Sequence, residues 1–230
     1  MKRFYDEAKA ARNDAGWGIA LDGKPVMTPG RAPLAVPAQK LADAMAAEWA
    51  GQEEKIDPLS MPLTGLANAA VDRIAPDPQS FAAELAKYGE TDLLCYRAES
   101  PVELVARQAK AWDPLLDWAS EQYGVTFETT TGIVHRPQPE PTVARLGEEV
   151  ARLGPFHLAG LSPLVRIGGS LVAALGLAER AFDEDAAWAA TRIDEDWQSE
   201  QWGDDEEAIE ARDAKRREFG AGMRFLRLLD

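Results

Sequence analysis

Cysteine and histidine are scarce in this sequence of 230 residues, which contains one cysteine and two histidines. A single cysteine, Cys95, excludes an internal disulfide and is typical of a protein from a reducing compartment. His135 and His157 are too few to build a common zinc site with one cysteine. We therefore expect neither a disulfide framework nor a metal centre, and the sequence predicts no other cofactor.

Basic residues are also few, because 25 lysines and arginines face 39 aspartates and glutamates, for a formal net charge of −14. Phosphate backbones and anionic lipid surfaces attract positive charge, so this excess of acid argues against nucleic acid or a membrane face as the main partner. The longest apolar stretch, residues 167–178, is too short to cross a bilayer, and the first twelve residues have no apolar targeting core. We expect a soluble, cytoplasmic, monomeric protein.

Motifs of the common enzyme classes are missing. The sequence has no GxxxxGK[ST] phosphate loop, no GxGxxG dinucleotide motif and no GxSxG nucleophile elbow. Cys95 has apolar and aromatic neighbours, which are typical of a buried cysteine rather than a catalytic one. Two alternatives stay open: a small hydrolase that uses Cys95 or a carboxylate pair, and an acidic cation-binding protein. The acidic clusters lack the spacing of a calcium loop, and we expect a protein without an active site.

Two kinds of patterning divide the chain. Residues 1–37 are rich in proline and glycine between extended segments, and Asp22-Gly23 is a dipeptide favoured in tight hairpins. From residue 38 onward, apolar residues recur at helical spacings. We predict an α+β fold, with a small β-rich N-terminal domain (residues 1–37) followed by a larger, mostly helical domain (residues 38–230). The predicted helices cover residues 38–50, 63–74, 78–94, 101–123, 142–153, 155–165, 169–179, 182–202 and 205–229, and one further extended segment is expected at residues 125–134.

The densest concentration of charge and aromatic residues lies between residues 183 and 210. This segment of 28 residues holds twelve carboxylates and one base, Arg192, together with three of the seven tryptophans. A disordered acidic tail would be poor in aromatic residues. Carboxylates at the start of a helix complement the helix dipole, which explains part of the acidity without a partner. The remainder predicts a folded docking surface.

A single helix over residues 182–202, at about 100° per residue, would present two faces. Trp188 and Trp202 would lie on the arc that also holds Glu195, away from the core. We predict that these two tryptophans contact a partner, and the alternative is that another element of the domain covers them. The expected core stripe consists of Phe182, Ala186, Ala189, Ala190, Ile193 and Trp197.

Several motifs occur together in a pattern known from one protein family. They are Lys2-Arg-Phe-Tyr5, Gly16-Trp17, Leu21-Asp-Gly-Lys-Pro25, Thr28-Pro29, Pro33-Leu-Ala-Val-Pro37, Ile56-Asp57-Pro58, Met61-Pro-Leu-Thr64, Leu66-Ala-Asn68, Tyr88, Thr91-Asp-Leu-Leu-Cys-Tyr-Arg97, Trp112-Asp-Pro-Leu-Leu116 with Trp118, and Asp194-Glu195 followed by Trp197-Gln198, Glu200 and Trp202-Gly203. Together they resemble the assembly chaperones for the alpha subunit of the F-type ATP synthase, found in mitochondria and alphaproteobacteria. The resemblance covers nearly the whole chain, and the last motif is its most specific part.

This resemblance implies a non-enzymatic chaperone with a β-rich N-terminal domain and a helical C-terminal domain. It implies that the partner is the unassembled alpha subunit, whose surface for the beta subunit is protected until the catalytic head forms. In the family, functional importance is placed on an acidic residue of the C-terminal helical region, for which Asp194 and Glu195 are the candidates here. Together with the helical phase, this predicts partner binding by Trp188, Asp194, Glu195, Glu200 and Trp202.

Overall fold

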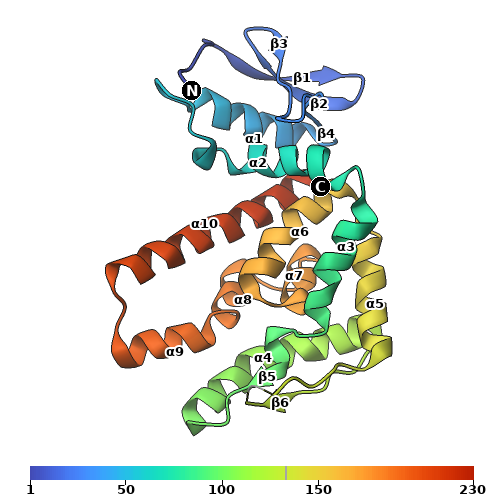
Figure 1. The fold of residues 1–230 in the computed structure, drawn as a ribbon, viewed down its shortest axis with the longest axis vertical. Helices are drawn as coiled ribbons and strands as arrows, with labels where there is room; N and C mark the ends of the chain where they lie inside the picture. Colours follow the sequence, from blue (N-terminus) through green and yellow to red (C-terminus); the bar gives the residue numbers. More distant parts are fainter. Residues whose placement is uncertain (133) are drawn as a thin grey trace. The chain divides into compact units, whose positions relative to one another are not determined.

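The structure is a computed structural model that describes residues 1–132 and 134–230. Its packing divides the chain into two compact units (Figure 1). The first comprises Met1–Pro78, Gly154–Gly160 and Ala221–Asp230, and the second comprises Gln79–Leu153 and Leu161–Gly220. The predicted α+β class is confirmed, because the larger sheet lies near the N-terminus and helices dominate the rest. The last strand of the larger sheet ends at Val36 and the first helix begins at Gln39, and the first packing unit continues to Pro78.

An antiparallel four-stranded sheet packs against a helix in the first unit. The strands of the sheet are β1 (Ala8–Asn13), β2 (Gly16–Leu21), β3 (Lys24–Pro25) and β4 (Ala35–Val36), and the helices of this unit include α1 (Gln39–Ala50) and α2 (Pro62–Ala69). The predicted hairpin is confirmed: Leu21 pairs with Lys24, and Asp22 and Gly23 have positive φ angles of 47° and 79°. Leu41 and Met45 of α1 are four residues apart and both buried, so one face of α1 covers the sheet.

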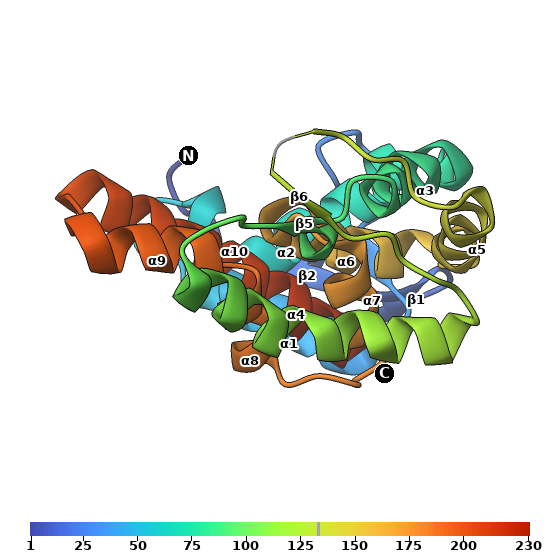
Figure 2. The same ribbon diagram turned by 90° about the horizontal axis from the view of Figure 1, so that it is seen from below.

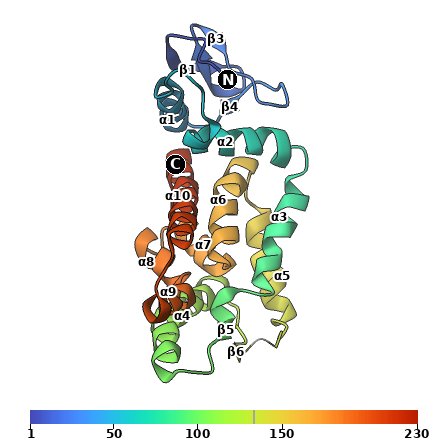
Figure 3. The ribbon, with the colours of Figure 1, turned by 60° about the vertical axis from the view of Figure 1, so that its left-hand side comes forward.

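The second unit is mostly helical. Its elements are α3 (Pro78–Ala86), β5 (Tyr96–Arg97), α4 (Val102–Tyr123), β6 (Thr130–Thr131), α5 (Glu140–Ala151), α7 (Leu171–Ala178), α8 (Glu184–Ala190) and α9 (Ile193–Trp202), with most of α6 (Pro155–Gly168) and α10 (Glu206–Leu229). The central helix α7 is buried from Leu171 to Leu177. Figure 2 shows α4 running beside α7 and α8, and Figure 3 shows α3 beside α5.

A buried carboxylate connects two parts of this unit. Asp92 is fully buried, and its side chain accepts hydrogen bonds from the backbone N–H of Leu94 at 3.1 Å and of Val172 at 3.0 Å. Burial raises the pKa of Asp92 to about 6, although these backbone hydrogen bonds oppose the rise. Asp92 therefore holds the turn before β5 against the first turn of α7.

Two predicted segments are shorter or less regular than expected. The helix expected over residues 78–94 ends at Ala86 and continues as 3-10 turns at Lys87–Gly89 and Leu93–Cys95. Among the described residues of the extended segment expected at residues 125–134, only Thr130–Thr131 forms a strand, which pairs in parallel with β5. Ile133, which belongs to that prediction, lies outside the described residues.

Candidate partner-binding surface

The acidic, tryptophan-rich segment forms two helices, α8 and α9, so the prediction of one helix over residues 182–202 is wrong. α8 ends at Ala190. The indole of Trp112, from α4, donates a hydrogen bond of 2.7 Å to the carbonyl of Ala190. Thr191 Oγ1 donates one of 2.8 Å to the carbonyl of Trp188. Because both bonds engage carbonyl oxygens that a continuous helix would use, they favour a break at this point.

The break changes the direction in which Trp188 points. Its indole packs edge-on against Phe219 of α10, with ring centroids 5.2 Å apart, and is half-buried. The guanidinium groups of Arg192 and Arg216 lie 5.8 and 5.5 Å from the Trp188 ring. The expectation that Trp188 faces outward is therefore wrong, and the structure shows the alternative in which another element covers it.

Trp197 was expected in the core and is only partly buried. The guanidinium of Arg107, from α4, lies over the Trp197 ring at 5.1 Å. The same guanidinium donates two hydrogen bonds to Glu200, at 2.7 and 2.9 Å, and these hydrogen bonds lower the pKa of Glu200. The expected core stripe is correct only in part: Ala190 and Ile193 are buried, and Ala186 and Ala189 are exposed. Glu200 and Trp197 therefore fasten α9 to α4.

The structure separates the two acidic candidates. Asp194 accepts a hydrogen bond of 2.6 Å from the side-chain amide of Gln108, which is buried in α4. The oxygen of that amide accepts a hydrogen bond of 2.7 Å from the backbone N–H of Ala98. Glu195 is exposed and pairs with Arg192 at 3.1 Å. Asp194 thus faces α4, whereas Glu195 faces away from it.

Trp202 is the most exposed of the candidate residues, with 79% of its surface accessible. It ends α9 and lines a surface hollow together with Arg192, Glu195, Gln198, Ser199, Asp204 and Arg212. Ser199 donates a hydrogen bond of 2.5 Å to Asp204, which braces the turn into α10. Of the predicted set, only Glu195 and Trp202 lie together on this open face.

Carboxylates continue from this hollow along the start of α10. Within the described part of the chain, Glu206, Glu207 and Glu210 form no ion pair, and all three are exposed. Asp204 is paired with Arg212 at 2.9 Å. Two of the three free carboxylates lie in the first turn of α10, where they complement the helix dipole. The outer surface of α9 and early α10 is therefore strongly negative.

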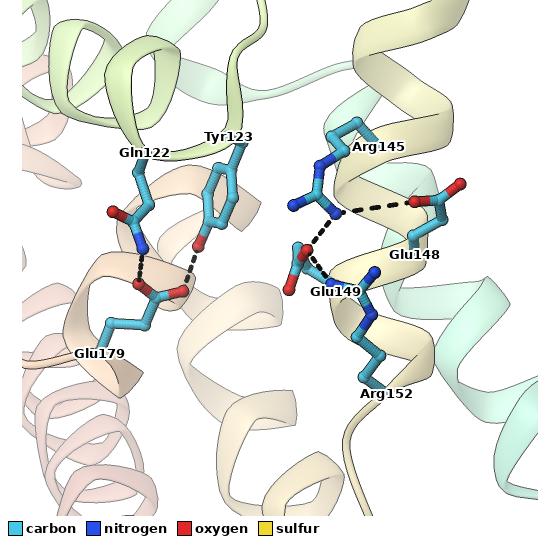
Figure 4. Close-up of polar contacts among 7 residues, drawn as sticks. All are labelled: Gln122, Tyr123, Arg145, Glu148, Glu149, Arg152 and Glu179. Carbon is cyan, nitrogen blue, oxygen red and sulfur yellow. Dashed lines mark hydrogen bonds and ion pairs between the residues drawn. The ribbon is translucent and has the colours of Figure 1, made fainter.

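A second polar cluster, shown in Figure 4, joins the end of α4 to α7 and contacts α5. Glu179 accepts hydrogen bonds from Tyr123 at 2.5 Å and from Gln122 at 2.8 Å. Burial and the Glu179 carboxylate raise the pKa of Tyr123. In the α5 part of the cluster, Glu149 pairs with Arg145 and Arg152, and Glu148 also pairs with Arg145. The hydrogen bonds to Glu179 hold the end of α4 against the end of α7, which is a structural role.

Cys95 does not have the environment of a catalytic thiol. It is fully buried, and burial raises its pKa to about 12, with the nearby Asp92 carboxylate acting in the same direction. A nucleophilic cysteine requires a thiolate, which this environment disfavours. In the described residues, no group of three or more His, Cys, Asp and Glu side chains is placed to hold a metal ion, and no helix is long and apolar enough to cross a membrane.

Known proteins share both the sequence and the fold of this chain. Residues 2–120 match the model of the family described as ATP12 chaperone protein. The chain is 24% identical to the mitochondrial protein atp12 of Schizosaccharomyces pombe in an alignment of 222 residues that covers 91% of this chain and 76% of that protein. The crystal structure of Atp12 from Paracoccus denitrificans is 41% identical in sequence and matches with a TM-score of 0.94. The match covers all of this chain and 98% of that one.

The Atu1473 protein of Agrobacterium tumefaciens is 40% identical, with a TM-score of 0.95, and 86% of its chain is covered. These comparisons confirm the resemblance that the motifs indicated. The family model spans about half of the chain, and the solved structures match all of it. The chain belongs to the ATP12 chaperone protein family, whose members are chaperones and not enzymes.

Proposed function

We propose that this protein is an assembly chaperone of the F-type ATP synthase that binds the unassembled alpha subunit and holds it until the catalytic head forms. The observation that carries the proposal is membership of the ATP12 chaperone family, together with the motifs that resemble alpha-subunit chaperones. The sequence contains no phosphate-loop motif, so the protein is proposed to hold its client without hydrolysing ATP.

The proposed contact surface is the open face of α9 and the turn that follows it. Trp202 offers a large exposed ring and Glu195 an exposed carboxylate, and both line the same hollow. Asp194 and Glu200 lie on the side of α9 that faces α4, and we propose that their hydrogen bonds to α4 support the contact surface by fixing the position of α9. Trp188 supports the same surface through its packing on α10.

Aggregation of the client tests this function. Alpha subunit diluted from denaturant should scatter less light in the presence of an equimolar amount of this protein without ATP. Glu195→Lys should reduce the protection, whereas Leu59→Ala, at an exposed site in the first unit, should retain it. Equal scattering with and without the parent protein would refute the proposal.

Location and oligomeric state accompany this proposal as predictions. The sequence predicts a cytoplasmic monomer, whereas the Schizosaccharomyces pombe relative is named mitochondrial. Cell fractionation measures the first property, and light scattering coupled to size-exclusion chromatography measures the second.

A further inference from the structure

Three tryptophans of the second unit share one arrangement, in which an arginine lies over the indole and also pairs with a carboxylate. The sets are Trp112 with Arg97 and Asp113, Trp188 with Arg216 and Glu184, and Trp197 with Arg107 and Glu200. The guanidinium carbons lie 5.1 to 5.5 Å from the ring centroids, and the ion pairs measure 2.7 to 3.0 Å. Each arginine is thus held by the face of an aromatic ring and by a negative charge.

The hollow at Trp202 is lined by two carboxylates, Glu195 and Asp204, which already pair with Arg192 and Arg212. In the part of the chain that the structure describes, no cation lies over the Trp202 indole and no aromatic ring stacks on it. Glu195 lines the same hollow and accepts a hydrogen bond from Arg192 through Oε1 alone. Among the described residues, none donates a hydrogen bond to Oε2 of Glu195, so that oxygen is open to a further donor.

The two ion pairs within the hollow balance in charge, and the unpaired carboxylates of α10 beside it favour a basic ligand that also carries an apolar group. Glu206, Glu207 and Glu210 follow within two turns of α10, and Ile209 between them is 40% exposed. A negative surface next to an exposed ring and an aliphatic side chain complements a basic segment with an apolar residue near its arginine.

We infer that an arginine side chain of the client occupies this hollow, with its guanidinium over Trp202 and hydrogen-bonded to Glu195. The bound arginine completes at Trp202 the arrangement that the chain builds internally at three other tryptophans. Arginine fits better than lysine, because its planar group stacks on a ring while its edge donates to a carboxylate. The inference rests on the proposed function, since it names the chemistry of the client segment that this surface recognises.

Peptide titration tests the ligand chemistry without the client. The probes are a ten-residue peptide with two arginines and two leucines, and the same peptide with citrulline in place of arginine. The readout is the indole N–H spectrum of the seven tryptophans, with the Trp202 signal assigned from Trp202→Phe. The arginine peptide should shift the Trp202 signal saturably, and the citrulline peptide should not.

Variants of the full chain localise the effect. Glu195→Gln should weaken binding of the arginine peptide at least tenfold, whereas Glu121→Gln, at an exposed carboxylate of α4, should leave it unchanged. A Trp202 signal that stays fixed with the arginine peptide, or that shifts equally with the citrulline peptide, would overturn the inference.

The alpha subunit distinguishes this inference from the proposed function. If the parent captures the alpha subunit and Trp202→Ala captures it equally well, the arginine hollow is wrong while the chaperone function stands. If the arginine peptide binds at Trp202 but the parent does not capture the alpha subunit, the chosen client is wrong while the hollow retains its ligand.

Discussion

Charge reversal at Asp194 and at Glu195 should have different consequences for stability, although the two residues are adjacent. Asp194→Lys removes the acceptor for the buried amide of Gln108 and places an ammonium group beside that donor. A buried donor without a partner costs about 1–3 kcal/mol. We expect Asp194→Lys to lower the free energy of unfolding by about 2–3 kcal/mol. The lysine ammonium and the Gln108 amide are both donors, so neither satisfies the other.

Glu195→Lys breaks the ion pair with Arg192, in which the Glu195 side chain is 51% exposed and the Arg192 side chain 12% exposed. We expect a loss of about 1 kcal/mol, at the upper end of the range for surface pairs. Urea unfolding followed by tryptophan fluorescence and circular dichroism measures both variants, and Asp194→Asn is the matched control because it keeps an acceptor for Gln108. We expect Asp194→Asn to stay within about 1 kcal/mol of the parent. Equal stability of Asp194→Lys and Glu195→Lys would refute the assignment of Asp194 to the α4–α9 contact.

Three further predictions follow from buried positions. Gly176→Ala should destabilise the protein by about 1–3 kcal/mol, because its methyl group would lie 2.1 Å from the Phe182 ring. The control Gly65→Ala, in open space on α2, should stabilise the protein by up to about 1 kcal/mol. Thermal melts compare the two variants. Asp92 has a pKa raised from 3.8 to about 6, so its ionisation lowers stability as pH rises through that interval. The stability of the parent relative to Asp92→Asn should therefore increase by about 2 kcal/mol between pH 7.5 and pH 4 in urea titrations, and a constant difference would contradict the burial of this charge. Cys95 should resist a thiol reagent at pH 8 in the native protein and react after denaturation; rapid native reaction would show an accessible thiolate.

Local chemistry predicted those parts of the fold whose causes lie within a few residues. The Asp22-Gly23 hairpin needs only two positions that accept positive φ, and α10 begins one residue from its predicted start. The break between α8 and α9 depends instead on Trp112, whose indole reaches Ala190 from 78 residues away. No periodicity within residues 182–202 contains that contact, so the sequence predicted one uninterrupted helix.

The same distinction applies to the candidate surface. The exposure of Trp202 was predicted correctly, since 79% of its surface is accessible at the end of α9. Trp188 was placed outward because Phe219, which covers it, comes from a helix whose packing the local pattern does not contain. Asp194 and Glu195 are equivalent as sequence neighbours, and only the buried Gln108 distinguishes them.

The energetics of this surface suit a chaperone that must release its client. Burying a tryptophan removes roughly 150–250 Å² from water, which at about 25 cal/mol per Å² corresponds to about 4–6 kcal/mol. Association alone costs an estimated 4–15 kcal/mol, so Trp202 by itself does not provide tight binding. The free carboxylates of α10 add attraction that accelerates encounter more than it slows dissociation. Under the proposed function, a client that binds through one exposed ring and a screened negative surface would be captured quickly and would remain displaceable by a subunit that buries a larger apolar interface.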